Sequence, residues 1–97
     1  MTKDEIKAGN TLISDFLGTH GAILGFDLDW DLIMQAISKL SIEINFTLSG
    51  NIHQWEAIFF DDKLKFSGNG FKLSKTSRDP IEATWLAVVD YLKTKIK

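Results

Sequence analysis

Residues 79–97, DPIEATWLAVVDYLKTKIK, decide the fold of this chain. Asp79 is typical of a helix N-cap, and Pro80 suits the first helical position because no hydrogen bond needs its missing N–H group. Glu82 stands where a capping box places its acidic residue. Apolar residues then recur on one face of a helix, at Ile81, Trp85, Val88, Leu92 and Ile96, and Ala87, Val89 and Tyr91 widen this face. The stretch predicts a C-terminal helix that packs this face against the rest of the domain.

Two further helices are predicted in the first half of the chain. Thr2 and Glu5 fit a capping box, and Gly18 is a typical C-terminal residue, so a helix is expected over Lys3–Leu17. A connector over Thr19–Leu28 follows. Asp27 or Asp29 then caps a second helix, whose expected buried face is Leu32, Ile33, Ala36, Ile37 and Leu40.

Alternating apolar and polar residues predict strands between the second and the last helix. The clearest is Ser41–Ser49, in which Ile42, Ile44, Phe46 and Leu48 share one face. A second strand is expected over His53–Phe60, and after a turn at Asp61-Asp62 a third over Lys63–Ser67. Residues 71–74 alternate as well, as a short fourth strand or an ordered loop, and residues 75–78 are expected to connect to the last helix.

The predicted order α-α-β-β-β-α describes a single α+β domain over residues 1–97, with an antiparallel sheet of three or four strands and helices packed on it. The N-terminal helix would lie beside the other helices, or it would cover the second face of the sheet. The first arrangement gives two layers and the second gives three.

Composition excludes several classes of function. The chain has no Cys, so disulfides and thiolate chemistry are ruled out, and a reducing cytoplasm is the expected compartment. The charged start at Lys3, Asp4 and Glu5 is unlike a secretory signal, and no apolar run is long enough to span a bilayer. The net charge of -2 argues against nucleic acid as a general partner.

No motif predicts a catalytic, metal or cofactor site. Asp27, Asp29 and Asp31 begin like a calcium loop, but Leu32 and Ser38 stand where Gly and Glu are required. Asp61-Asp62 is typical of a solvated turn, and Gly68-Asn69-Gly70 lacks the third glycine of a dinucleotide site. His20 and His53 have no partner at ligand spacing. The chain is therefore expected not to be an enzyme and to need no cofactor.

Lys72, Lys75 and Arg78 form a local basic cluster before the last helix. A helix, three strands and a helix with basic residues ahead of it resembles the double-stranded-RNA-binding module, in which lysines at the start of the last helix grip phosphates. Here Asp79 and Glu82 add negative charge at that position. Nucleic-acid binding through these three residues is the alternative hypothesis.

A second resemblance covers most of the chain. Residues 10–18 (NTLISDFLG), residues 29–33 (DWDLI) leading to Ile37 and Leu40, and residues 81–89 (IEATWLAVV) resemble small uncharacterised proteins of Bacteroidetes and their phages. Those proteins are similar to the phage α-β-α sandwich domains. The resemblance implies a fold and a phage-related origin, and it carries no functional residues.

The leading hypothesis is a non-enzymatic accessory protein that binds a protein partner or forms a homo-oligomer. Aromatic residues make up 11% of the chain, and the strand at residues 53–60 is apolar on both faces. Side chains left uncovered would form the partner surface, and the candidates are Trp30, Ile58 and Phe60.

Overall fold

A computed structural model describes residues 2–19, 25–61 and 71–96 of the chain. The helices and strands of these residues follow in the predicted order: α1 (Lys3–Leu17), α2 (Trp30–Leu40), β1 (Asn45–Gly50), β2 (Trp55–Phe60), β3 (Lys72–Ser77) and α4 (Pro80–Ile96). The α+β class and the α-α-β-β-β-α order are therefore confirmed. No helix in the described ranges is long and apolar enough to cross a membrane.

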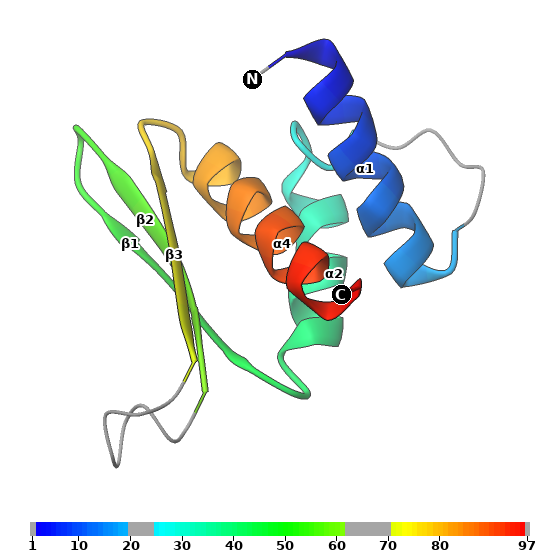
Figure 1. The fold of residues 1–97 in the computed structure, drawn as a ribbon. Helices are drawn as coiled ribbons and strands as arrows, with labels where there is room; N and C mark the ends of the chain where they lie inside the picture. The colour runs from blue at the N-terminus through cyan, green and yellow to red at the C-terminus, as the bar shows by residue number, and fades with distance from the viewer. Residues whose placement is uncertain (1, 20–24, 62–70, 97) are drawn as a thin grey trace.

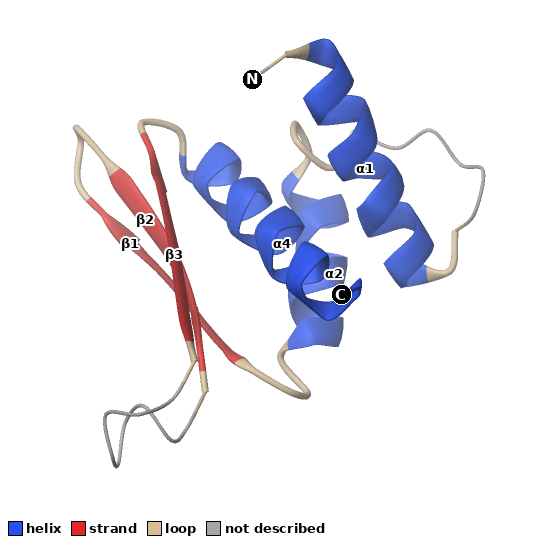
Figure 2. Ribbon diagram, viewed as in Figure 1, coloured by secondary structure: helices blue, strands red, loops and turns tan. Residues whose placement is uncertain are grey.

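The elements form three layers with α4 in the middle (Figure 1). One side of α4 packs on the sheet, mainly over β2 and β3, and the other side packs on α1 and α2. Figure 2 shows that none of the described helices lies on the face of the sheet turned away from α4. Neither arrangement expected for the N-terminal helix is fully correct: α1 lies on the helical side of the sheet, but it packs on α4 as part of a third layer. The second face of the sheet, here called the open face, is not covered by any described helix.

The cap predicted for α4 is present. A side-chain oxygen of Asp79 accepts a hydrogen bond from the N–H of Ile81 at 3.0 Å, and Pro80 is the first helical residue. The N–H of Asp79, which Glu82 would bind in a capping box, donates instead to the hydroxyl of Ser77 at 3.2 Å. The helix start is therefore anchored both to its own first turn and to the end of β3.

Burial extends around α4 beyond the single predicted face. Its buried residues are Ile81, Ala83, Thr84, Trp85, Ala87, Val88, Val89 and Leu92. Helices that are apolar nearly all round are buried between layers, and the central position of α4 accounts for this pattern. Trp85 and Val89 contact α1, whereas Tyr91 stacks on Phe59 of β2.

Local signals also set the bounds of α1 and α2. The hydroxyl of Thr2 accepts from the N–H of Glu5 at 3.1 Å, and Gly18 ends α1 with φ 79°, a left-handed conformation that favours glycine. Asp29, one of the two predicted caps, accepts from the N–H groups of Asp31 and Leu32 at the start of α2. Both helices were thus predicted from their ends.

Trp85 joins α4 to α1 through a close contact. Its indole N–H donates to the side-chain oxygen of Asn10 at 2.8 Å, and the Asn10 amide donates to Asp27 at 2.9 Å. The indole ring lies against Gly9, which is buried and offers no side chain in its way. Phe26, in the expected connector, is fully buried in the same core.

The sheet is antiparallel in the order β1-β2-β3. The register places Phe46 of β1 and Leu73 of β3 opposite Phe59, on the face toward α4. Ile58 lies between Thr47 and Ser74 on the open face, and Phe60 lies between Asn45 and Lys72 on that same face.

The strand boundaries differ from those predicted. Residues 41–44 form a turn because the N–H of Ile44 bonds back to Leu40 of α2, so β1 begins at Asn45 and Ile42 is 87% exposed. A bend at residues 52–53 makes β2 begin at Trp55. Residues 72–77 are a full strand, which corrects the expected short strand and connector at residues 71–78. The strand predicted at 63–67 lies outside the described residues.

Candidate interaction surface

The open face of the sheet carries two of the three predicted surface residues. Ile58 and Phe60 point away from α4 from the central strand and are half-buried. Their neighbours in β1 and β3 on this face are polar, and beside them Ser74 donates to the carboxylate of Glu56 at 2.5 Å. The open face therefore has an apolar centre, flanked by the polar side chains that β1 and β3 direct to this face.

Trp30 does not belong to this face. It is the first residue of α2 and is 40% exposed, near Leu28 and Met34, which are also exposed. Because α2 packs on α4 and α1, it lies on the helical side of the sheet, opposite the open face (Figure 1). The structure thus brings Ile58 and Phe60 together and places Trp30 on a separate surface.

The predicted basic cluster is divided by the sheet. Lys72 and Lys75 are three residues apart in β3, so their side chains lie on opposite faces. Lys72 is on the open face, whereas Lys75 forms an ion pair with Asp90 of α4 at 2.6 Å. Arg78 is exposed beyond the end of β3 and precedes Asp79 in the sequence. These three residues do not form one phosphate-binding surface.

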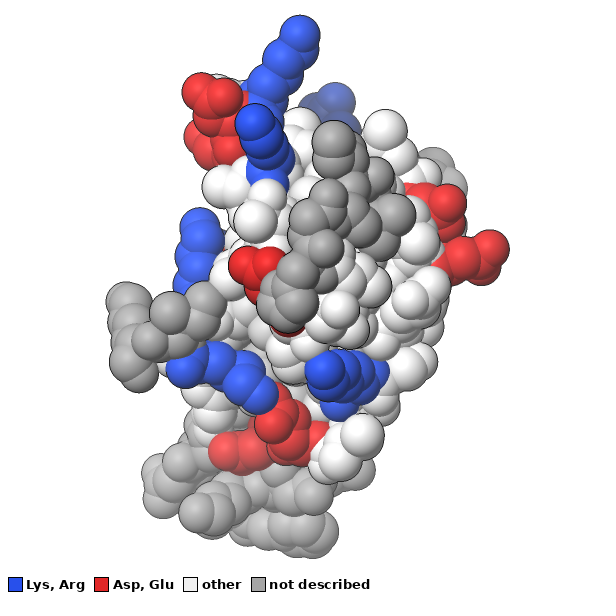
Figure 3. All heavy atoms as spheres, turned by 90° about the vertical axis from the view of Figure 1, so that its right-hand side faces the viewer, with Lys and Arg blue, Asp and Glu red and all other residues white. Residues whose placement is uncertain are grey.

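Charged side chains are also mixed on the helical side of the molecule. Figure 3, turned to face the side on which α1 lies, shows Lys and Arg interspersed with Asp and Glu. Affinity for the phosphate backbone depends on several basic groups acting together. No observation on this face favours nucleic acid as the ligand.

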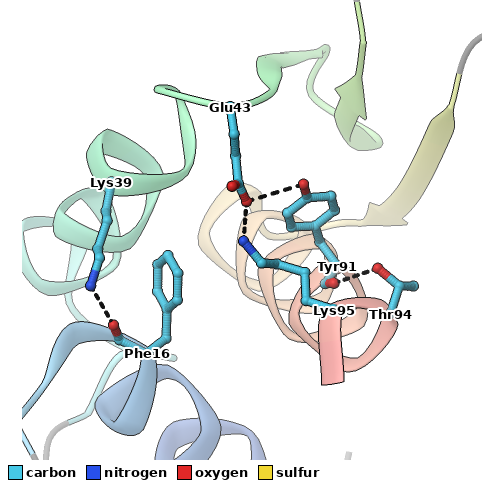
Figure 4. Close-up of polar contacts among 6 residues, drawn as sticks. All are labelled: Phe16, Lys39, Glu43, Tyr91, Thr94 and Lys95. Atoms are coloured by element: carbon cyan, nitrogen blue, oxygen red, sulfur yellow. Dashed lines mark hydrogen bonds and ion pairs between the residues drawn. The ribbon is translucent and has the colours of Figure 1, made fainter. Parts of the chain in front are cut away.

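A polar cluster that the sequence did not predict joins the turn before β1 to the end of α4 (Figure 4). One carboxylate oxygen of Glu43 accepts from the ammonium group of Lys95 and from the hydroxyl of Tyr91, the latter at 3.2 Å. Nearby, Lys39 of α2 donates to the carbonyl of Phe16 at the end of α1 at 2.6 Å. These contacts hold together three segments that are distant in sequence.

The electrostatics of this cluster do not suit acid–base catalysis. The hydrogen bond and charge of Lys95 lower the pKa of Glu43 below the usual 4.5. Partial burial, followed by the charge of Glu43, raises the pKa of Tyr91 above the usual 10.0. A catalytic acid or base works best with a pKa near the operating pH, and both shifts lead away from neutrality.

A pocket of about 290 Å³ lies beside this cluster, between α1 and the end of α4. Its lining is Leu12, Asp15, Phe16, Leu92 and Lys95. Lys95 forms an ion pair with Glu43, and Asp15 also interacts with another group of the protein. Both charged side chains at this pocket therefore already have interactions within the protein.

The other residues considered for chemistry have structural roles or lie apart. Asp29 caps α2, and Asp27 accepts from Asn10. Asp61 pairs with Phe71 through its backbone N–H and through a side-chain oxygen. His53 is exposed in a bend, whereas Asp62, His20 and the Gly68–Gly70 segment lie outside the described residues. Within the described ranges, no three His, Asp or Glu side chains are grouped to hold a metal ion.

Comparisons with known proteins give no match, whether to a family model, to a curated protein or to a solved structure. The geometry of this chain is therefore the basis on which a function can be proposed.

Proposed function

We propose that this chain is a non-enzymatic interaction protein that binds a protein partner or a second copy of itself through the open face of its sheet. The observation that supports this is the placement of Ile58 and Phe60. They occupy the centre of a sheet face that none of the described helices covers. An antiparallel sheet with one solvated face ordinarily carries polar residues there. Large apolar side chains at its centre favour a contact with another protein.

The surroundings of this pair suit a protein interface. Interfaces commonly have an apolar centre and a polar rim that remains accessible to water. Here the rim is formed by hydroxyl and charged side chains of the edge strands, and the hydrogen bond between Ser74 and Glu56 holds part of it in place. In line with the resemblance to phage and Bacteroidetes proteins, we expect an accessory role in the cytoplasm.

A double variant, Ile58→Thr with Phe60→Thr, tests this proposal. Thr retains strand propensity while it removes most of the apolar surface, so the fold should persist. Two measurements apply: sedimentation over a range of protein concentrations, and capture of proteins from an extract of the source cells. Association or capture that the double variant loses would support the proposal.

Trp30→Gln is the matched control because it removes an exposed aromatic residue from the other side of the molecule. If Trp30→Gln abolishes binding and the double variant does not, the open sheet face is the wrong surface. A wild-type chain that captures nothing and stays monomeric at millimolar concentration would refute the function itself.

A further inference from the structure

We propose that two copies of this chain associate through β1, so that their sheets join into one six-stranded antiparallel sheet. The inference goes beyond the proposed function, because the contact it names is an edge of the sheet and not the open face. Its first basis is the position of β1. In the order β1-β2-β3, β1 pairs with one strand of the described chain, so its other edge carries backbone groups without a strand beside them.

The register identifies these backbone groups. The N–H of Asn51 donates to the carbonyl of Gln54 at 3.0 Å, at the pair that continues the β1–β2 ladder. Bonding groups alternate along an antiparallel strand, so Thr47 and Ser49 direct their N–H and C=O toward β2. The N–H and C=O groups of Phe46 and Leu48 therefore point to the outer edge.

The outer edge of β1 also lacks the features that commonly prevent strands from pairing between molecules. Its sequence, NFTLSG, contains no charged residue and no Pro, and its register with β2 runs through all six residues without a bulge. β3, at the opposite edge, carries Lys72 and Lys75. The two edges thus differ, and β1 is the one open to strand addition.

β1 is complementary to itself about a two-fold axis through Thr47. In that register Phe46 of one copy lies opposite Leu48 of the other, on the face toward the helices. Asn45 lies opposite Ser49 on the open face. Phe46 and Leu48 are half-buried, so the contact covers apolar surface that α4 leaves partly exposed. β1 has no charged side chain, so the pairing of two copies brings no like charges of this strand together.

A second observation outside the strand supports the same axis. Ile42 is 87% exposed and Ile52 is 92% exposed, and they flank β1 at equal distances in sequence from Thr47. Antiparallel pairing brings Ile42 of one copy to the end of the joint sheet where Ile52 of the other copy lies. The two most exposed apolar side chains among the described residues, one in the turn before β1 and one in the bend after it, would then lie at the same ends of the contact.

A two-fold contact closes after two copies, unlike the pairing of β1 with β3 of another copy, which would continue into a fibre. A contact of one six-residue strand is small, so the dimer belongs to the weak, reversible class. The joint sheet keeps the open faces of both copies on one side. Ile58 and Phe60 then occur twice on a single extended surface, which stays available to a partner protein.

Thr47→Lys tests this arrangement, because it places two like charges against each other at the axis. Thr47 is exposed, and Thr76→Lys is the matched control: the same change on the same face, at the other edge of the sheet. Sedimentation equilibrium should show a wild-type dimer at millimolar concentration and a dissociation constant raised about tenfold or more by Thr47→Lys. Thr76→Lys should leave it unchanged.

Cross-linking gives a second test that does not depend on the stability of a charged variant. The chain has no Cys, so Thr47→Cys provides a single thiol. At the axis the two Cα atoms would be about 4.5 Å apart, within the range that a disulfide spans. Mild oxidation should give a covalent dimer much faster for Thr47→Cys than for Thr76→Cys, and equal rates would overturn the inference.

The remaining outcomes separate this inference from the proposed function. A wild-type chain that is monomeric at millimolar concentration overturns the pairing through β1. A dimer that persists in the Thr47→Lys variant but dissociates in the double variant Ile58→Thr with Phe60→Thr also overturns the pairing through β1. That result would instead support the open face as an interface. A dimer that responds only to the change at Thr47 supports the inference.

Discussion

Gly9→Ala is expected to destabilise the protein, although alanine favours helices. Gly9 lies inside α1 and is buried against Trp85. A Cβ atom there would lie 2.3 Å from Cζ2 and 2.6 Å from Cη2 of the Trp85 ring, and 3.0 Å from a methyl group of Val89. The ring cannot easily move, because it is 2% exposed and its N–H is bonded to Asn10.

Opposing contributions decide whether Gly9→Ala raises or lowers the free energy of unfolding. Replacing Gly by Ala inside a helix stabilises it by about 1 kcal/mol. Extra volume in a packed core costs about 1–3 kcal/mol, and displacing the indole from Asn10 removes a hydrogen bond that contributes about 1 kcal/mol. The free energy of unfolding should therefore fall by about 1–3 kcal/mol. For a chain of this size, each kcal/mol corresponds to a decrease of about 4–8 °C in Tm.

Urea unfolding followed by circular dichroism measures this change, provided that the slope with urea stays constant. Gly25→Ala is the control because an added Cβ there meets no atom within 4 Å. It should be neutral or stabilising by up to about 1 kcal/mol. If Gly9→Ala is as stable as wild type or more stable, the contact between α1 and α4 does not have the geometry described.

Three further predictions concern the interactions that hold the layers together. Asn10→Ala removes the partners of both Trp85 and Asp27 and should cost about 1–3 kcal/mol in urea unfolding; no loss would contradict the buried hydrogen bond. Asp79→Ala should cost about 1 kcal/mol in the same assay, and a much smaller cost would mean that α4 does not depend on this cap. Glu43→Gln should lower Tm slightly near neutral pH. Because the folded protein lowers the pKa of Glu43, its contribution is full above the unfolded value of 4.5 and is lost as the pH falls through the folded value. The Tm difference from wild type should therefore vanish in acid and shrink in high salt, since the pair is exposed; a constant difference would contradict the role of the charge.

The ends of the helices were predictable because their signals are local. Thr2, Gly18 and Asp79 act within one turn of the residues they cap, so their roles as helix caps can be predicted from the neighbouring sequence. The start of β1 was not predictable in this way. Alternation of apolar residues continues from Ile42 through Leu48, but backbone bonds to Leu40 turn residues 41–44 back on α2. Periodicity does not distinguish an exposed Ile42 from a buried Ile44.

The position of α4 between two layers also could not be predicted from the sequence. The stripe from Ile81 to Leu92 indicates one apolar face, whereas Ala83 and Thr84 carry no strong sign of burial. These small residues are buried because two layers meet at this helix. The order of elements fits more than one arrangement of layers, so tertiary packing decides.

The open face was partly predictable. Ile58 and Phe60 break the polar alternation of their strand, and this departure identified them. The division of the basic cluster follows from the period of two along a strand, but only once residues 72–77 are known to be a strand. The edge position of β1 depends on strand order, which no local pattern encodes.

The central position of α4 has a consequence for biosynthesis. The ribosome makes this helix after every other described element, yet it supplies the surface on which both the sheet and the α1–α2 pair are packed. A nascent chain that ends before residue 80 has two apolar surfaces with no helix between them to join them. During translation, such a chain exposes these surfaces to chaperones and to aggregation until α4 emerges.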